Sequence, residues 1–80
     1  MLSTTKIENA KAKEKPYKLY DAEGLYVLVN PNGSKLWRFR YQFEGRAKLV
    51  AVGKFPSIGL KVARERASDA RRQVAEGDSI

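Results

Sequence analysis

The most regular pattern in the chain is an alternation of aromatic and polar residues between positions 35 and 43. Successive side chains of a β-strand point to opposite faces of the sheet, so this alternation predicts a strand with one buried face and one exposed face. The predicted buried face carries Trp37, Phe39, Tyr41 and Phe43. The opposite face carries Arg38, Arg40 and Gln42.

Further strands are expected at residues 17–21, 25–29 and 46–52, which are short and largely apolar. Turn signals separate them. Residues 21–24 begin with Asp and end with Gly, which predicts a type I turn. Residues 30–33 hold Pro31 at the second turn position and Asn-Gly after it, which predicts a chain reversal. Residues 44–45 predict a tight turn, and Gly53 is expected to end the fourth strand.

The fourth strand can be oriented in two ways, because a shift of one residue exchanges its faces. We favour the orientation in which Val50 and Val52 point to the core. Ala47, Leu49 and Ala51 would then point outward. The opposite orientation is nearly as good from the sequence alone.

Helical periodicity is clearest at residues 60–76. An apolar residue recurs there every three or four positions, at Leu60, Ala63, Ala67, Ala70 and Val74. Gly59 or Ser57 is expected at the start of this helix and Gly77 at its end. A short helix is also expected near residues 4–10, because Thr5 and Glu8 have the spacing of a capping box. In it, Ile7 and Ala10 would face the core.

These elements predict an α+β fold. An antiparallel sheet of three or four strands would be covered on one face by the C-terminal helix, and a short N-terminal helix would precede the sheet in the chain. The alanine stripe would let that helix lie close to the aromatic residues. The other face of the sheet would stay open and carry Arg38, Arg40 and Gln42.

Charge distinguishes the middle of the chain from its ends. The 80 residues carry a net charge of +7, with 16 Lys and Arg against 9 Asp and Glu. Residues 35–54 alone hold six basic residues and one acidic residue. A basic patch on an otherwise balanced chain is typical of a protein that binds a polyanion. Solvated surface charge is the competing interpretation, and it leaves the clustering unexplained.

The composition also excludes several functions. The chain contains no Cys and no His, which removes disulfides, thiolate and imidazole metal sites, and the usual neutral-pH general base. No Ser/His/Asp set, metal cluster or phosphate-binding loop can be assembled, so we expect no enzyme activity and no cofactor. No apolar run reaches the length of a membrane helix.

The predicted open face has the dimensions of a DNA-reading ribbon. The major groove is roughly 12 Å wide and admits two β-strands, and side chains on one strand face repeat at roughly 7 Å. Arg38 and Arg40 could bind guanine, and Gln42 could bind adenine, each through two hydrogen bonds. Further basic residues are expected to contact phosphates and fix the register: Lys35, Arg46, Lys48 and Lys54.

Each of these assignments has a simpler alternative. The polar residues could form the ordinary outer face of an antiparallel sheet, but such faces usually mix acids with bases. The aromatic residues could stack on bases, yet their strict alternation favours the core. The helix arginines alternate with acids and are most simply solvated: Arg64, Arg66, Arg71 and Arg72.

Several motifs resemble the N-terminal domain of prophage and genomic-island integrases, which are tyrosine recombinases. The similar runs are KLYD at 18–21, GLYVLV at 24–29 and GSKLWRFRY at 33–41. GKFP at 53–56, Leu60, Ala63-Arg64 and AEGD at 75–78 continue the resemblance across nearly the whole chain. The chain departs from the family at Gly59, where a Ser-type helix cap is common.

The resemblance implies an arm-type DNA-binding domain at residues 1–80, part of a longer integrase. Such a domain binds accessory sites that flank the crossover site, with its sheet in the major groove, while separate domains bind the core site and cut DNA through a tyrosine. Tyr41 would not be that nucleophile, since the Arg/His/Tyr set needs a His. The implied partners are double-stranded DNA, other integrase subunits and accessory DNA-bending proteins, with no membrane. The implied location is the bacterial cytoplasm, with the nucleoid as the place of action.

Two other functions compete with this reading. An open sheet edge or the helix could mediate contacts between recombinase subunits or with an accessory factor, which would make the chain an assembly module. The other competing function is binding of RNA, which ranks third after DNA binding and assembly.

Overall fold

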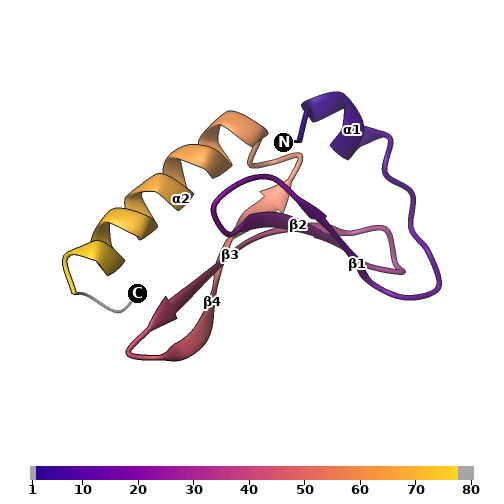
Figure 1. Cartoon of the computed structure of the whole chain (residues 1–80). Helices are drawn as coiled ribbons and strands as arrows, with labels where there is room; N and C mark the ends of the chain where they lie inside the picture. Colours follow the sequence, from indigo (N-terminus) through magenta and orange to yellow (C-terminus); the bar gives the residue numbers. More distant parts are fainter. Residues whose placement is uncertain (1, 78–80) are drawn as a thin grey trace.

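The computed structural model describes residues 2–77, and Asp78, the last residue of the AEGD motif, lies outside them. Within them the chain forms, in order, α1 (Thr4–Glu8), β1 (Tyr17–Tyr20), β2 (Leu25–Val29), β3 (Lys35–Phe43), β4 (Arg46–Phe55) and α2 (Leu60–Ala75). The four strands make one antiparallel sheet in the order β1-β2-β3-β4, and α2 lies across one of its faces (Figure 1). The α+β architecture predicted from the sequence is therefore confirmed.

The aromatic face of β3 forms the core, as its alternation predicts. Trp37, Phe39 and Tyr41 are 0%, 2% and 7% exposed. They pack with the buried alanines of α2, whose short side chains allow the helix to approach the rings. Phe43 is half-buried against the same cluster. The indole nitrogen of Trp37 donates a 2.7 Å hydrogen bond to the carbonyl of Ile58, so this buried polar atom is satisfied.

The favoured orientation of the fourth strand is correct. Val52 is buried and Val50 is half-buried in the core, whereas Ala47, Leu49 and Ala51 are exposed. The structure now gives the reason. Antiparallel pairing places Phe39 opposite Val50 and Arg40 opposite Leu49, so the strict alternation of β3 fixes the faces of β4.

The prediction that Gly53 ends the fourth strand is wrong, since β4 continues to Phe55. A register shift between Trp37 and Arg38 leaves Val52 as an extra residue, which is a β-bulge. Gly53 has a φ of +150°, and a Cβ there would lie 2.5 Å from Cγ1 of Ile58. The glycine therefore allows a close approach of the following loop rather than a strand end.

Two local predictions at the N-terminal side also need correction. The N-cap of α1 is Ser3, whose hydroxyl accepts from the backbone of Lys6, so Thr5 and Glu8 form no capping box. The first turn is centred one residue later than expected. Its hydrogen bond runs from Leu25 N–H to Ala22, and Glu23 and Gly24 both have positive φ, as in a type I′ rather than a type I turn. The first strand accordingly ends at Tyr20.

The remaining elements agree closely with expectation. Ile7 is fully buried and Ala10 is packed against the core, so the N-terminal segment adds to the layer that α2 forms. Gly59 is the N-cap of α2, without a side-chain hydrogen bond, and Ser57 is not used. The turn at 30–33 closes through Gly33 N–H to the carbonyl of Asn30, as the position of Pro31 predicts.

Candidate nucleic-acid interface

The face of the sheet opposite α2 is built from alternate residues of all four strands. The register assigns to it Lys18, Tyr20, Tyr26, Leu28, Leu36, Arg38, Arg40, Gln42, Ala47, Leu49, Ala51 and Lys54. We call this set the open face. None of the four strands contains an Asp or Glu. The open face is thus cationic and lacks the cross-strand ion pairs that an ordinary outer face carries.

Arg38 and Arg40 lie near the centre of the open face. Arg38 is half-buried between Tyr26 of β2 and Ala51 of β4, and Arg40 is exposed beside Leu49. Within residues 2–77 neither guanidinium forms an ion pair. The Nε of Arg38 is buried and has no hydrogen-bond partner there. Its N–H is therefore a donor that the protein itself leaves unused.

Tyr26 is only 3% exposed although it belongs to the open face. The Nζ of Lys18 lies 5.2 Å from the centre of its ring, and the ring of Tyr20 lies 5.8 Å away at 48°. Together Lys18 and Tyr20 extend the open face across β1, and sequence reasoning did not include them. The alternation of residues 17–20 indicates that Lys18 and Tyr20 share one face of their strand. Only the pairing of Tyr20 with Tyr26, and of Tyr26 with Arg38, shows that this is the face that carries Arg38.

The seven residues predicted to contact DNA are divided between the two faces of the sheet. Arg38, Arg40, Gln42 and Lys54 share the open face. The other three, Lys35, Lys48 and Arg46, lie on the side of the aromatic residues, opposite Phe55, Tyr41 and Phe43. A role in DNA binding remains a prediction for all seven.

The three residues on the aromatic side line its rim. The Nζ of Lys35 donates to the carbonyl of Glu8 at 3.3 Å and lies 5.8 Å from the ring centre of Phe55. The Nζ of Lys48 lies 5.4 Å from the ring centre of Phe43. The structure therefore does not bring these side chains into the row formed by Arg38 and Arg40.

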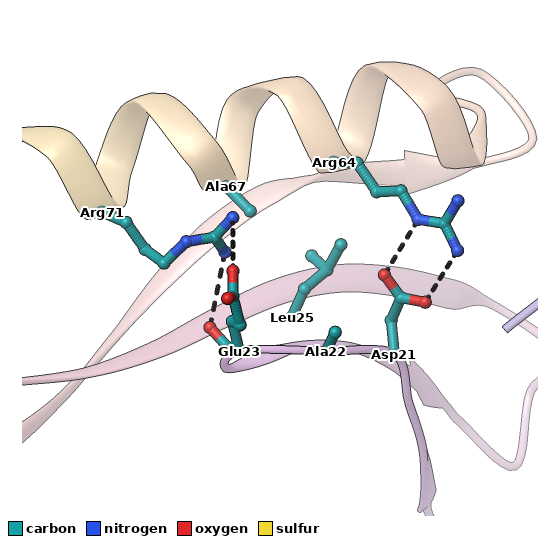
Figure 2. Close-up of a pocket in the computed structure, with 7 residues that line it drawn as sticks. All are labelled: Asp21, Ala22, Glu23, Leu25, Arg64, Ala67 and Arg71. Atoms are coloured by element: carbon teal, nitrogen blue, oxygen red, sulfur yellow. Dashed lines mark hydrogen bonds and ion pairs between the residues drawn. The ribbon is translucent and has the colours of Figure 1, made fainter. Parts of the chain in front are cut away.

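The expectation that the helix arginines are merely solvated is wrong for three of the four. Arg71 binds Glu23 through a 3.0 Å ion pair, and Arg64 binds Asp21 through two hydrogen bonds of 2.9 and 3.0 Å (Figure 2). Arg66 donates to the carbonyl of Val52 at 2.8 Å. Among residues 2–77, Arg72 finds a partner only in its own helix, where it lies 3.7 Å from Asp69.

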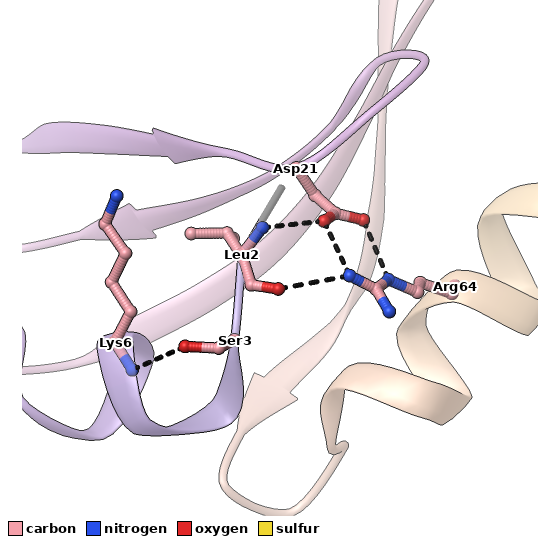
Figure 3. Close-up of polar contacts among 5 residues, drawn as sticks. All are labelled: Leu2, Ser3, Lys6, Asp21 and Arg64. Atoms are coloured by element: carbon pink, nitrogen blue, oxygen red, sulfur yellow. Dashed lines mark hydrogen bonds and ion pairs between the residues drawn. The ribbon is translucent and has the colours of Figure 1, made fainter.

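Asp21 is the centre of a polar cluster that ties three segments together. Its carboxylate also accepts a 2.9 Å hydrogen bond from the backbone of Leu2, whose carbonyl accepts one of 3.1 Å from Arg64 (Figure 3). The Asp21 side chain is 2% exposed. The hydrogen bonds from Arg64 and Leu2 lower the pKa of Asp21 despite the opposing effect of burial. The same pairing raises the pKa of Arg64.

These ion pairs line the hollow of Figure 2, so it offers no unpaired charge for a ligand. Among residues 2–77 no three acidic side chains gather closely enough to hold a metal ion. In the same part of the chain neither helix is long and apolar enough to cross a membrane. The cationic open face is the feature left to explain.

The chain belongs to the family described as the Arm DNA-binding domain, which matches residues 2–80. It is similar to an integrase of Shigella phage Sf6, with 46% identity over 77 residues, which are 96% of this chain and 20% of that protein. Prophage integrase IntS of Escherichia coli K12 gives the same values. Prophage integrase IntZ of the same strain is 49% identical over 78 residues, 95% of this chain and 19% of its own length.

These matches confirm the resemblance to prophage integrases that the motifs indicate. The chain spans about a fifth of the length of each of these relatives.

Proposed function

We propose that this chain binds double-stranded DNA at arm-type sites through the open face of its sheet. By doing so it positions a site-specific recombinase during prophage integration and excision. It would be the arm-binding domain of a longer tyrosine recombinase, with the catalytic domain elsewhere in that protein and the bacterial nucleoid as its place of action. The observation that carries the proposal is a cationic open face without a single carboxylate in the strands.

The proposed mode of binding follows from side-chain chemistry. The β3–β4 ribbon enters the major groove, where Arg38 and Arg40 bind guanines and Gln42 binds an adenine. Within residues 2–77 no carboxylate forms an ion pair with Arg38 or Arg40, which supports this role because both guanidinium groups remain able to bind acceptors of DNA. Lys18 and Lys54 flank this row on the open face and contact phosphates.

Phosphates on the groove walls would also be reached from the rim of the other face. Lys35 and Lys48 have long flexible side chains, and Arg46 lies at the end of the ribbon. With Lys18 and Lys54 this makes five candidate phosphate contacts. Five contacts correspond to a slope of about −4.5 for the logarithm of affinity against the logarithm of salt concentration.

The first test is fluorescence anisotropy of a labelled duplex, recovered by selection from a random-sequence pool, at several salt concentrations. We expect a slope near −4.5, and a reduction of its magnitude by about 0.9 for Lys18→Ala. Duplex RNA of the same sequence should bind more weakly, because its deep, narrow major groove excludes a ribbon. A slope near zero would remove the basis for DNA binding.

The second test separates base reading from charge. Arg38→Ala and Arg40→Ala should each lower the preference for the selected duplex over random DNA by about 1–3 kcal/mol, while the fold stays intact. Arg72→Ala, which removes an exposed guanidinium from α2, is the control and should leave the preference unchanged. Unfolding of both open-face variants, or equal loss in the control, would contradict the assignment.

An assembly module is the second candidate. The ladder between β2 and β3 ends at Leu25 and Phe39, and the N–H of Arg40 still donates to the carbonyl of Gly24. Beyond Arg40, β3 has no neighbour on that side among the described strands. Val62 adds an exposed apolar side chain on α2. Self-association in analytical ultracentrifugation, combined with salt-insensitive DNA binding, would favour this candidate over the first.

A further inference from the structure

Polar and apolar residues lie side by side on the open face. The polar residues of β3 each face an apolar residue of β4 across the ladder, in the pairs Arg38–Ala51, Arg40–Leu49 and Gln42–Ala47. Directly opposed residues of an antiparallel pair have Cβ atoms about 4.5–5.5 Å apart. A surface that presents the polar row to a ligand therefore presents the apolar row to the same ligand.

Leu49 stands out within the apolar row. The residue is 54% exposed, whereas the alanines on either side of it in the row each present only a methyl group. Large apolar side chains are exposed at two other positions in residues 2–77, and of these Tyr20 lies on the open face and Val62 on α2. Leu49 is thus a large exposed aliphatic residue that lies directly opposite Arg40.

We propose that Leu49 contacts the C5 methyl group of a thymine, so that the recognised site holds a thymine next to the base pair bound by Arg40. This inference rests on the proposed function. The thymine methyl is the apolar group that base pairs display in the major groove, and aliphatic side chains bind it. Burying Leu49 there removes apolar surface from water on both molecules.

The spacing fits adjacent base pairs. Successive base pairs are about 3.4 Å apart along the DNA axis. Two side chains whose Cβ atoms are about 5 Å apart can therefore reach the same base pair or neighbouring ones. Arg40 binds the guanine edge, and Leu49 covers the methyl group beside it. Leu49 then determines specificity without any hydrogen bond.

The experiment uses the 80-residue chain and the duplex recovered by selection from a random-sequence pool. Each thymine is replaced in turn by deoxyuridine, which removes the methyl group and nothing else. We expect the affinity to fall about four-fold at one thymine, the value of a single buried methyl group, and to stay unchanged at the others. Leu49→Ala should bind more weakly and lose this four-fold discrimination. Leu49→Met, which keeps a long apolar side chain, should retain it.

Val62→Ala is the matched control, because it removes an exposed aliphatic side chain far from the open face. It should keep the selected sequence and the response to deoxyuridine. A selected site without thymine, indifference to every deoxyuridine, or unchanged discrimination in Leu49→Ala would overturn the role of Leu49 while salt-dependent binding stands. Absence of salt-dependent binding would instead overturn the proposed function and this inference with it.

Discussion

Replacement of Asp21 by Asn tests the polar cluster that joins the N-terminal segment, the first turn and α2. The side chain keeps its shape but loses its charge and one acceptor oxygen. In the native protein Asp21 accepts two hydrogen bonds from Arg64 and one from Leu2, all between 2.9 and 3.0 Å. In Asn the NH2 group would replace one carboxylate oxygen, so that a hydrogen-bond donor would point at the N–H donors of Arg64.

The expected loss follows from the exposure of the two partners. A hydrogen bond to a charged group contributes about 1.5–3 kcal/mol, and several are lost together. Arg64 is 39% exposed, so water replaces part of what its guanidinium loses. We therefore expect Asp21→Asn to lower the free energy of unfolding by about 2 kcal/mol at pH 7. Urea titration followed by the fluorescence of Trp37, the sole tryptophan and fully buried, measures it.

The pH dependence gives an independent readout of the same cluster. The pKa of Asp21 is lower in the folded protein than its ordinary value of 3.8, so the unfolded chain binds this proton more readily. The stabilisation is fully present above the unfolded pKa and is lost as the pH falls through the folded pKa. The difference in unfolding free energy between the native chain and Asp21→Asn should thus shrink below about pH 4.

Glu23→Gln provides the control, because the pair of Glu23 with Arg71 has side chains 69% and 35% exposed. Such a surface pair should contribute about 0.5 kcal/mol or less. Equal losses for Asp21→Asn and Glu23→Gln would refute the reasoning. So would a difference between Asp21→Asn and the native chain that stays constant from neutral to acidic pH.

The core and the first turn give two further predictions. Trp37→Ala should lower the free energy of unfolding by about 3–5 kcal/mol, since it empties the centre of the core and leaves the Ile58 carbonyl without its partner. Because this variant has no tryptophan, its urea titration is followed by circular dichroism. A loss below about 1 kcal/mol would contradict the core assignment. Gly24→Ala should destabilise the protein more than Gly33→Ala. Both glycines have φ above +90°, but only at Gly24 would a Cβ overlap the carbonyl oxygen of Arg40, so equal effects would exclude that contact as a cause.

The sequence predicts best where one periodicity runs without interruption. The alternation of β3 gives both its bounds and its faces, because rings and guanidinium groups cannot exchange sides without burying charge. The stripe of α2 likewise places its buried alanines correctly. For Val50 and Val52 both orientations were open, and pairing with Phe39 decides between them.

Long-range contacts account for what the sequence does not show. In the sequence Asp21 is recognisable only as a residue that favours turns, whereas its hydrogen-bond partner Arg64 lies 43 positions away along the chain. Gly53 looks like a strand end, whereas its role is to make room for Ile58. Lys35 and Lys48 lie on the other face of the sheet from Arg38, and the alternation of side chains along each strand predicts this from the sequence. A count of charges along the chain does not reveal it, because such a count does not distinguish the two faces of a sheet.

The overhang of the β3–β4 hairpin has a consequence for dynamics. Beyond Phe39 the two strands pair with each other but not with β2, and Figure 1 shows this end projecting from the body of the protein. Backbone hydrogen bonds with few packed neighbours open at lower free energy than those of the core, so amides near Glu44 and Gly45 should exchange hydrogen fastest within the sheet. We therefore expect this end of the hairpin to bend more easily than the part of the sheet that packs against α2.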